Sequence, residues 1–302
     1  MVEKINVTFL GTGSAIPTAR RNHLAILLKY KAENILVDCG EGTQRQFRKA
    51  GLNPCKLTKI LISHWHGDHV LGLPGLLMTM MMNGYNKNLE IYGPRGTNEN
   101  VKQYFDLIGR KGWELNVKVH EVKNGVFFDD GDFCLESAEV DHDSPAVAYS
   151  FKVKEKNRLD KKKLEKLKIP NSPLIGELVK GKIVEINGKK VNGKKLMYKE
   201  DSRKVAFVMD TRKCEGAVDI SKGADVLISE STYSKEEEEI ADKHGHLTSV
   251  GAASIAKKAK VKALALVHLS QRYDEIPKVI LKEAKKVFKD VIVPEDLDEI
   301  EL

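Results

Sequence analysis

One stretch of ten residues, "LISHWHGDHV", beginning at residue 61, holds three histidines and an aspartate within six positions. Neutral imidazole and carboxylate groups are the usual protein ligands of zinc and its transition-metal neighbours. His64 and His66 are two residues apart, so in an extended turn their side chains point to the same side. Gly67 permits a sharp bend, after which Asp68 and His69 can face a second ion. The spacing therefore predicts two neighbouring metal sites.

Neither pair completes a coordination shell, so further ligands are expected from elsewhere in the chain. Four apolar runs, "KILIS", "KVAFVMD", "ADVLISE" and "VKALALVH", are typical of buried strands and lead into the His64 stretch, Asp210, Glu230 and His268. Reactive groups at the carboxyl ends of strands are how open α/β sheets build a site. We expect His142, in the polar turn "VDHDSP", to complete the first metal site and His268 the second. Asp210 is expected to bridge them.

The composition predicts a large α/β protein. The 302 residues are 41% hydrophobic and 31% charged, which is typical of a folded chain with a sizeable core. Helical patterns at Ser249–Lys260 and Asp274–Phe288 separate the predicted strands. No apolar run is long enough to cross a bilayer, and four isolated cysteines without a C-x-x-C pair fit reduced thiols. We expect a cytoplasmic protein with no membrane partner.

The positive charge of the chain is concentrated in one segment. Residues 152–199 contain sixteen basic and five acidic residues, a net charge of +11, and the other residues together carry −4. Prolines and glycines interrupt this segment, so we interpret it as a flexible basic arm inserted into a single domain that spans residues 1–302. The alternative is a solvated lysine-rich surface. The candidate phosphate contacts are Lys154, Lys156, Arg158, Lys161, Lys162 and Lys163.

The ligand pattern resembles that of a known group of hydrolases. H-x-H-x-D-H, followed by a distant His, an Asp and a final His, is the ligand series of the metallo-β-lactamase superfamily. Within it, "FLGTGSAIPTARRN", "LVDCGEGTQRQ" and the "DTR" that begins at Asp210 resemble ribonuclease Z, the tRNA 3′-processing endonucleases. The resemblance covers nearly the whole chain. It implies an αββα sandwich of two similar halves, with the metals at one edge between the sheets.

The resemblance also implies roles for individual residues. One zinc ion would be held by His64, His66 and His142, the other by Asp68, His69 and His268, with Asp210 between them. Two metal ions close together are the usual apparatus for attacking a phosphodiester.

Three residues are implied in proton transfer. Asp68 would also orient or deprotonate the attacking water, and His246, in "HGHLTS", would protonate the leaving 3′ oxygen. Glu230 would orient His246 through a hydrogen bond. The family usually has H-E-A-T at this strand end, whereas Ser229 stands here in place of the histidine. The contribution of that histidine is therefore lost or unimportant.

Two further residues match the "RN" of the family. Arg21 and Asn22 are expected to contact the RNA near the cut. The nearby "GTGSA" lacks the third glycine of a dinucleotide fingerprint, and Pro17 follows where a helix should begin. We interpret it as a tight turn that lines the site.

The favoured function is zinc-dependent cleavage of the 3′ trailer from precursor tRNA, after the discriminator nucleotide, leaving a 3′-hydroxyl. One alternative is another hydrolase of the superfamily that acts on a small ester, for which a long basic arm has no use. A second is a non-catalytic RNA-binding protein, which a complete ligand set disfavours. The resemblance further implies a homodimer.

Overall fold

The structure is a computed structural model that describes residues 3–107, 115–167, 169, 172–186 and 188–302. The chain divides into two compact units. The larger unit contains Met1–Asp129, Leu135–Phe151 and Lys204–Leu302, and the smaller contains Asp130–Cys134 and Lys152–Arg203. Every predicted metal ligand lies in the larger unit, and the predicted basic arm lies in the smaller one.

The first large sheet comes from the first half of the chain plus the last strand. Its strand order is β18 (Glu299–Glu301), β1 (Ile5–Gly11), β2 (Ala25–Tyr30), β3 (Glu33–Val37), β4 (Lys59–Leu61), β5 (Asn88–Gly93), β6 (Asn116–Glu121). Strands β3 to β6 run parallel to one another. Helices α1 (Thr43–Lys49), α2 (Gly67–Val70), α3 (Leu73–Met82) and α4 (Thr97–Leu107) follow these strands, with the 3-10 turn η1 (Pro54–Lys56).

The second large sheet has the order β17 (Val291–Ile292), β16 (Ala263–Val267), β15 (Val226–Glu230), β14 (Arg203–Val208), β9 (Val147–Val153), β8 (Phe133–Glu139), β7 (Gly125–Asp129). Strands β14 to β17 are parallel. Its helices are α8 (Glu215–Ser221), α9 (Glu238–Lys243), α10 (Ser249–Ala259) and α11 (Lys278–Lys285), with 3-10 turns η2 (Lys235–Glu237) and η3 (Gln271–Tyr273). Each of the two sheets therefore contains a block of parallel strands with helices between them, so the two halves of the larger unit have similar architectures.

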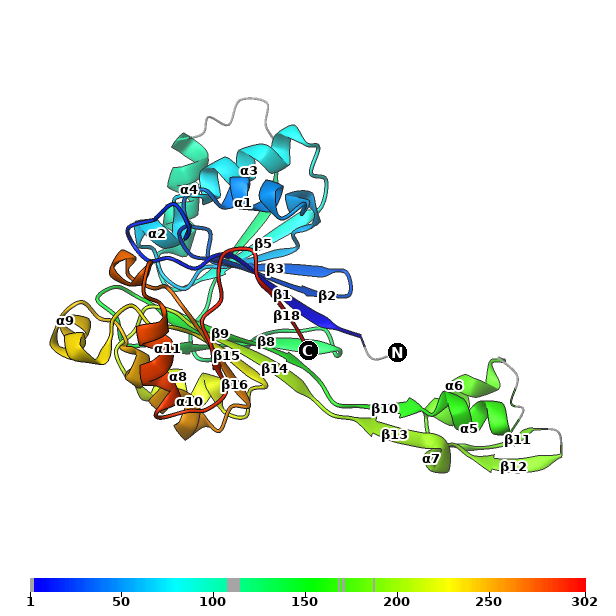
Figure 1. The fold of residues 1–302 in the computed structure, drawn as a ribbon. Helices are drawn as coiled ribbons and strands as arrows, with labels where there is room; N and C mark the ends of the chain where they lie inside the picture. Colours follow the sequence, from blue (N-terminus) through cyan, green and yellow to red (C-terminus); the bar gives the residue numbers. More distant parts are fainter. Residues whose placement is uncertain (1–2, 108–114, 168, 170–171, 187) are drawn as a thin grey trace. The chain divides into compact units, whose positions relative to one another are not determined.

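The two sheets pack face to face, and the helices cover their outer faces (Figure 1). The ring of Tyr30 on β2 meets Phe151 on β9 edge-on, with centroids 5.5 Å apart. Tyr149 Oη donates a hydrogen bond of 2.7 Å to the Ile62 carbonyl just after β4. Separate apolar clusters hold α1, α3 and α4 on the first sheet and α8, α10 and α11 on the second. The architecture is the expected αββα sandwich.

The predicted strands and helices are present, with one shorter helix. The four apolar runs form β4, β14, β15 and β16, and the Ser249–Lys260 pattern forms α10. The Asp274–Phe288 pattern yields only α11, because Pro277 occupies the N-cap and cannot donate a backbone hydrogen bond to a preceding turn.

The smaller unit has secondary structure and a small core of its own. Strand β10 (Lys156–Leu159) pairs with β13 (Met197–Glu200), and β11 (Ile183–Ile186) pairs with β12 (Lys189–Asn192). Helices α5 (Lys161–Lys166), α6 (Leu174–Val179) and α7 (Gly193–Leu196) accompany them. Leu178, Ile186 and Leu196 form the buried cluster. The segment expected as a flexible arm therefore contains a folded unit, attached through the two-stranded ribbon β10–β13.

Candidate metal centre and active site

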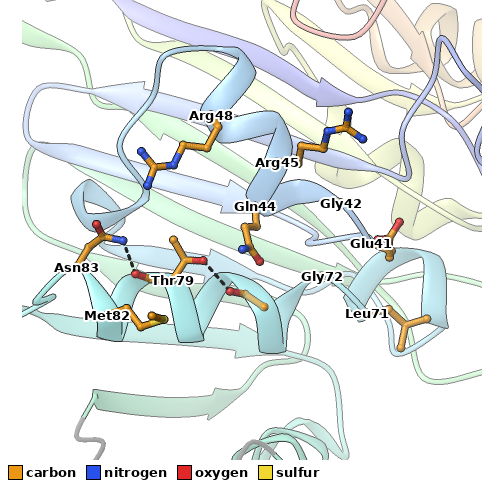
Figure 2. A pocket seen from close by; sticks show the side chains of 11 residues that line it. Glu41, Gly42, Gln44, Arg45, Arg48, Leu71, Gly72, Thr79, Met82 and Asn83 are labelled. Carbon is orange, nitrogen blue, oxygen red and sulfur yellow. Dashed lines mark hydrogen bonds between the residues drawn. The ribbon is translucent and has the colours of Figure 1, made fainter.

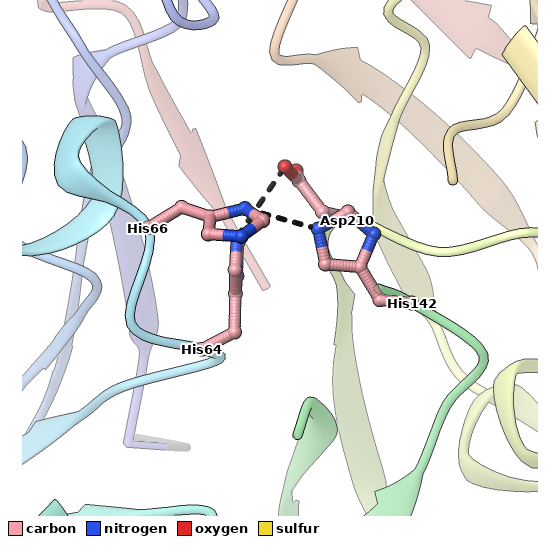
Figure 3. A group of neighbouring side chains, drawn as sticks. All are labelled: His64, His66, His142 and Asp210. Atoms are coloured by element: carbon pink, nitrogen blue, oxygen red, sulfur yellow. Dashed lines mark hydrogen bonds and ion pairs between the residues drawn. The ribbon is translucent and has the colours of Figure 1, made fainter. Parts of the chain in front are cut away.

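The seven predicted ligands converge at the edge where the parallel strands of both sheets end. His64, His66 and His142 form one group with Asp210, and their ligand atoms lie within 4.8 Å of one another (Figure 3). Asp68, His69 and His268 form a second such group, again with Asp210. The structure therefore brings together the two sets proposed from the sequence, and Asp210 belongs to both.

Asp210 lies at the centre of the cluster. Its Oδ2 is 3.5 Å from His64 Nε2 and 3.3 Å from His69 Nε2, and its Oδ1 is 3.4 Å from His268 Nε2. The side chain is buried, as are those of His64, His69 and His268. Only His66, of the residues facing it, is exposed. A carboxylate with imidazole nitrogens around it at these distances has the donor set and position of a shared metal ligand.

The tautomers of His69 and His268 follow from their outer hydrogen bonds. His69 Nδ1 lies 2.8 Å from the Asp38 carboxylate, which accepts, so Nδ1 carries the proton. Thr232 donates its hydroxyl proton to Glu230 at 2.6 Å, so it accepts from His268 Nδ1 at 2.9 Å. Both Nε2 atoms are then unprotonated, and their lone pairs face each other with the two nitrogens 3.2 Å apart. Two facing lone pairs at this distance repel unless a cation lies between them.

The first group has the same design. Ser63 donates to Asp38, so its hydroxyl oxygen accepts from His64 Nδ1 at 3.0 Å, and His64 Nε2 is a lone pair. That Nε2 atom is buried and has no hydrogen-bond partner among the described residues. His142 Nδ1 donates to the Gly245 carbonyl at 2.9 Å, which leaves its Nε2 for the metal side. Outer hydrogen bonds of this kind orient metal-ligating histidines. The residues present therefore fit a metal pair.

The electrostatics also require a positive charge. Burial alone lowers the pKa of His69, but the carboxylates of Asp210 and Asp38 outweigh it and raise that pKa well above its ordinary value. Burial alone raises the pKa of Asp210, but the imidazoles of His268 and His69 hold it well below the usual range. The pKa of His64 is lowered, first by burial and then by His69. The carboxylates therefore favour a positive charge within the cluster, which bound metal ions would supply.

His246 lies beside the cluster and faces Glu230. Its Nδ1 is 3.2 Å from Glu230 Oε1 and 3.7 Å from Asp210 Oδ2. Glu230 is fully buried, and it also accepts from the Thr211 backbone N–H at 2.9 Å. Burial alone lowers the pKa of His246, but Glu230 and Asp210 outweigh it and raise it to about 9. The ring is therefore held by a carboxylate through Nδ1, and Nε2 has no hydrogen-bond partner within the described part of the chain.

Three supporting residues were missed by the sequence interpretation. Asp38 accepts from His69, from the Ser63 hydroxyl at 2.8 Å and from the Ser63 N–H at 2.7 Å. Thr232 links Glu230 to His268. Asp38 directly follows strand β3, as Asp210 follows an apolar strand, so the same reasoning from strand ends would have identified it. Its backbone φ is 56°. Ser63 and Thr232 carry no comparable signal, because a hydroxyl beside a ligand is common anywhere.

The two residues of the "RN" pair are held within the protein. Arg21 is buried, with its Nη1 donating to Thr12 Oγ1 at 2.6 Å and to the Pro294 carbonyl at 2.8 Å. The expected contact of Arg21 with RNA does not fit this position, because its guanidinium holds the N-terminal loop against the C-terminal segment. Asn22 Nδ2 donates to the Glu41 carbonyl at 2.7 Å, and its side chain is only half-buried.

The predicted arm residues fall into two groups. Lys156 pairs with Asp132 and Arg158 with Glu200, so these charges are compensated within the smaller unit. Lys154 is half-buried at the end of β9. Lys161, Lys162 and Lys163 begin helix α5 and are exposed. With its four additional acids and Arg203 included, the smaller unit has a net charge of +8.

A groove of about 720 Å³ lies between α1 and α3 (Figure 2). Arg45 and Arg48 project from α1 above it, and Thr79 on α3 and Asn83 directly after α3 form its opposite wall. None of its lining residues is a predicted metal ligand. It is a feature separate from the metal cluster.

A double-sheet sandwich with seven histidine and aspartate side chains that could hold metal ions at one edge is typical of the metal-dependent hydrolases of the metallo-β-lactamase fold. The human short-form tRNase Z has the same fold, with a TM-score of 0.69 and 29% identity, and the match covers 98% of each chain. The metallo-β-lactamase fold protein YhfI of Bacillus subtilis matches with a TM-score of 0.72 over 100% of each chain; its 19% identity supports the fold alone.

The sequence relatives are more specific. The ribonuclease Z of Methanothermobacter thermautotrophicus is 38% identical over 99% of this chain and 97% of its own length. That of Latilactobacillus sakei is 36% identical over 97% and 96%. A family profile described as Anti-Pycsar protein Apyc1 matches residues 5–158, which end before Asp210 and His268. The chain belongs to the ribonuclease Z family, whose members are hydrolytic endoribonucleases.

Proposed function

We propose that the protein removes the 3′ trailer of precursor tRNA by one cut after the discriminator nucleotide, using two zinc ions. The observation that carries the proposal is the pair of ligand groups that share Asp210, with His246 beside them. One group offers His64, His66 and His142, and the other offers Asp68, His69 and His268. When bound, two such ions supply Lewis acidity and lower the pKa of water toward about 7.

The side chains divide the remaining work of the reaction. Asp68 Oδ2 lies 3.1 Å from His268 Nε2 at the mouth of the cluster, where it can orient an attacking water and accept its proton. The 3′ oxygen of the tRNA leaves from the side of the phosphorus opposite the attacking water, and it needs a proton. His246 can give it from Nε2, while Glu230 holds Nδ1 and stabilises the protonated ring.

The test is incubation with a 3′-extended tRNA and zinc or manganese, followed by mapping of both new ends. The proposal expects a tRNA that ends at the discriminator with a 3′-hydroxyl and a trailer with a 5′-phosphate. Cleavage of small phosphodiesters, thioesters or sulfate esters with no cleavage of the tRNA would instead support a small-ester hydrolase.

The pairing of His246 with Glu230 gives a first prediction that is independent of metal. In metal-free protein the pKa of His246, about 9, should fall toward its ordinary value when Glu230→Gln removes the carboxylate charge. Burial lowers the pKa of His246, and without the charge of Glu230 this lowering is opposed less strongly. NMR titration of the imidazole measures the shift, and Glu239→Gln, exposed on α9, is the matched control. An unchanged pKa would mean that Glu230 does not act on His246.

The arm is the part of the proposal that concerns substrate binding. We infer that the exposed lysines at the start of α5 contact phosphates of the tRNA. Lys161, Lys162 and Lys163 stand together, and Asp160 caps the helix by accepting from Lys162 N at 3.0 Å. Cations near a helix N-terminus are unfavourable for the helix, so their presence here needs a reason other than stability.

A second prediction follows for these three lysines. The triple variant Lys161→Gln, Lys162→Gln and Lys163→Gln should bind precursor tRNA more weakly and with a shallower salt dependence, by about 0.9 in log–log slope per lost phosphate contact. Turnover of a small phosphodiester dye should not change. Affinity measured across a salt series gives the slope.

The matched control removes three charges from α11 and the residue after it, namely Lys282→Gln, Lys285→Gln and Lys286→Gln. If both triple variants bind tRNA alike, the arm is only a solvated surface.

Two further expectations concern assembly and location. We propose a homodimer on the ground of the family resemblance, and a cytoplasmic location on the ground of the four isolated cysteines. The described residues include no helix long and apolar enough to cross a bilayer.

A further inference from the structure

A second pocket adjoins the metal cluster and has no assigned role. It has a volume of about 520 Å³, and His142 forms part of its lining. The pocket is built from loops that follow β5, β6 and β8. Strands β4, β5 and β6 are parallel neighbours, so the loops after β5 and β6 open at the same edge as the His64 stretch after β4. The pocket is therefore a lateral extension of the active site.

Two basic side chains line this pocket. Arg95 follows β5 and Lys123 follows β6, and both are exposed. Neither forms an ion pair with any residue that the structure describes. Of the two acids that line the pocket, Asp143 pairs with Arg212 at 2.8 Å, and Glu139 accepts a hydrogen bond from Asn124 at 3.1 Å. Arg95 and Lys123 therefore keep two positive charges without an ion-pair partner among the described residues, beside His142 of the metal cluster.

The pocket also has a positioned rim and an apolar wall. Glu121 accepts from the backbone N–H groups of Gly96 and Asn98 at 3.0 and 3.2 Å, which fixes the turn that carries Arg95. The Ser144 hydroxyl is shielded from solvent and has no hydrogen-bond partner within the described residues. The wall consists of Pro94, Val122, Val140, Pro145, Ala146 and Val147. Two cations that can meet phosphates, a hydroxyl without a partner among the described residues and an apolar wall suit a nucleotide strand.

The position of His246 gives the pocket a direction along the substrate. His246 lines a different, smaller pocket of about 130 Å³ together with Lys213, and His142 does not. The rings of His142 and His246 are 5.6 Å apart. If His246 protonates the leaving 3′ oxygen, the tRNA body lies on its side of the cluster. The strand beyond the scissile phosphate then continues past His142.

We propose that the pocket beside His142 binds the first nucleotides of the 3′ trailer, with Arg95 and Lys123 on the phosphates beyond the cut. This inference rests on the proposed tRNA cleavage. A trailer of one nucleotide contains only the scissile phosphate, so it cannot reach both cations. A trailer of several nucleotides can.

The experiment compares the two trailer lengths in wild-type protein and in the double variant Arg95→Gln and Lys123→Gln. For the long trailer the double variant should raise KM about tenfold, the usual loss for charge-assisted contacts. For the one-nucleotide trailer KM should stay close to the wild-type value. A 5′-phosphorylated oligouridine, followed by fluorescence anisotropy, measures binding without cleavage. Its log–log salt slope should become shallower by about 0.7 for each lost contact.

Matched controls separate the possible outcomes. Lys102→Gln with Lys118→Gln removes two exposed charges from α4 and β6 outside the pocket. An equal KM increase in this control, or an equal increase for both trailer lengths, overturns the subsite. A parallel loss of turnover on a small phosphodiester dye overturns it as well, because it places Arg95 or Lys123 in the metal centre. Wild-type protein that leaves precursor tRNA uncut refutes the proposed function instead, and the oligouridine measurement then decides the pocket alone.

Discussion

Asp210→Ala is expected to lower the metal content from about two ions per chain to less than about one and to abolish cleavage. Asp210 belongs to both ligand groups found among the described residues, and its carboxylate oxygens lie 3.3–3.5 Å from imidazole nitrogens of both. Its removal takes a ligand from each site and leaves facing imidazole lone pairs without a negative charge between them. Loss of an outer partner of a ligand usually costs about 10–100-fold in affinity or activity, so loss of the shared ligand should cost more.

Elemental analysis after zinc reconstitution, together with the cleavage rate, measures both effects. Asp141→Asn is the matched control, because Asp141 is an exposed carboxylate near the cluster, and among the described residues its side chain pairs only with Arg212. If the Asp210→Ala protein retained two ions, Asp210 would not be a shared ligand. One retained ion would assign the carboxylate to a single site.

The metal ligands were accessible from the sequence because two physical rules coincide at them. H-x-H-x-D-H restricts how four side chains can point within one turn. Apolar runs that end in Asp210 and His268 place the remaining ligands at strand ends, and parallel strands bring those ends to one edge. Each rule depends on one turn or on one sheet, so neither requires knowledge of how the two sheets pack on each other.

The outer hydrogen bonds were not accessible in the same way. Ser63, Thr232 and Asp38 matter because of what lies opposite them, and that depends on packing between segments far apart in the chain. Asp38 has a positive φ of 56° at the end of β3, and no residue pattern in the sequence predicts this backbone conformation. Only the strand-end position of Asp38 could have been read from the sequence.

Charge was a weaker guide than ligand type. Arg21 was expected to contact RNA because it matches the "RN" of the family, yet its guanidinium is buried against Thr12 and Pro294. In the arm, Lys156 and Arg158 are paired with acids, whereas the three lysines from Lys161 onward are exposed. A net charge of +11 over a segment does not show which cations face a partner. Ion pairing within the fold decides that.

His246→Ala should slow precursor tRNA cleavage by about 10²–10⁴-fold, the usual cost of losing a general acid, and leave metal content unchanged. The physical reason is that Glu230 fixes Nδ1 of the ring and leaves Nε2 for the leaving oxygen. Metal content and cleavage rate must be measured on the same protein, because His246 Nδ1 is also 3.7 Å from Asp210.

The chain provides a close control in His244, which is two residues away and exposed. His244→Ala should cleave at the wild-type rate. If His246→Ala lost its metals, His246 would be a ligand instead of an acid. A substrate whose leaving group has a low pKa offers a sharper test, because that group can leave as an anion without receiving a proton. With a nitrophenyl phosphodiester the His246→Ala defect should shrink toward none, whereas a defect equal to that on tRNA would show that the residue acts on the metals or on the fold and not on the leaving oxygen.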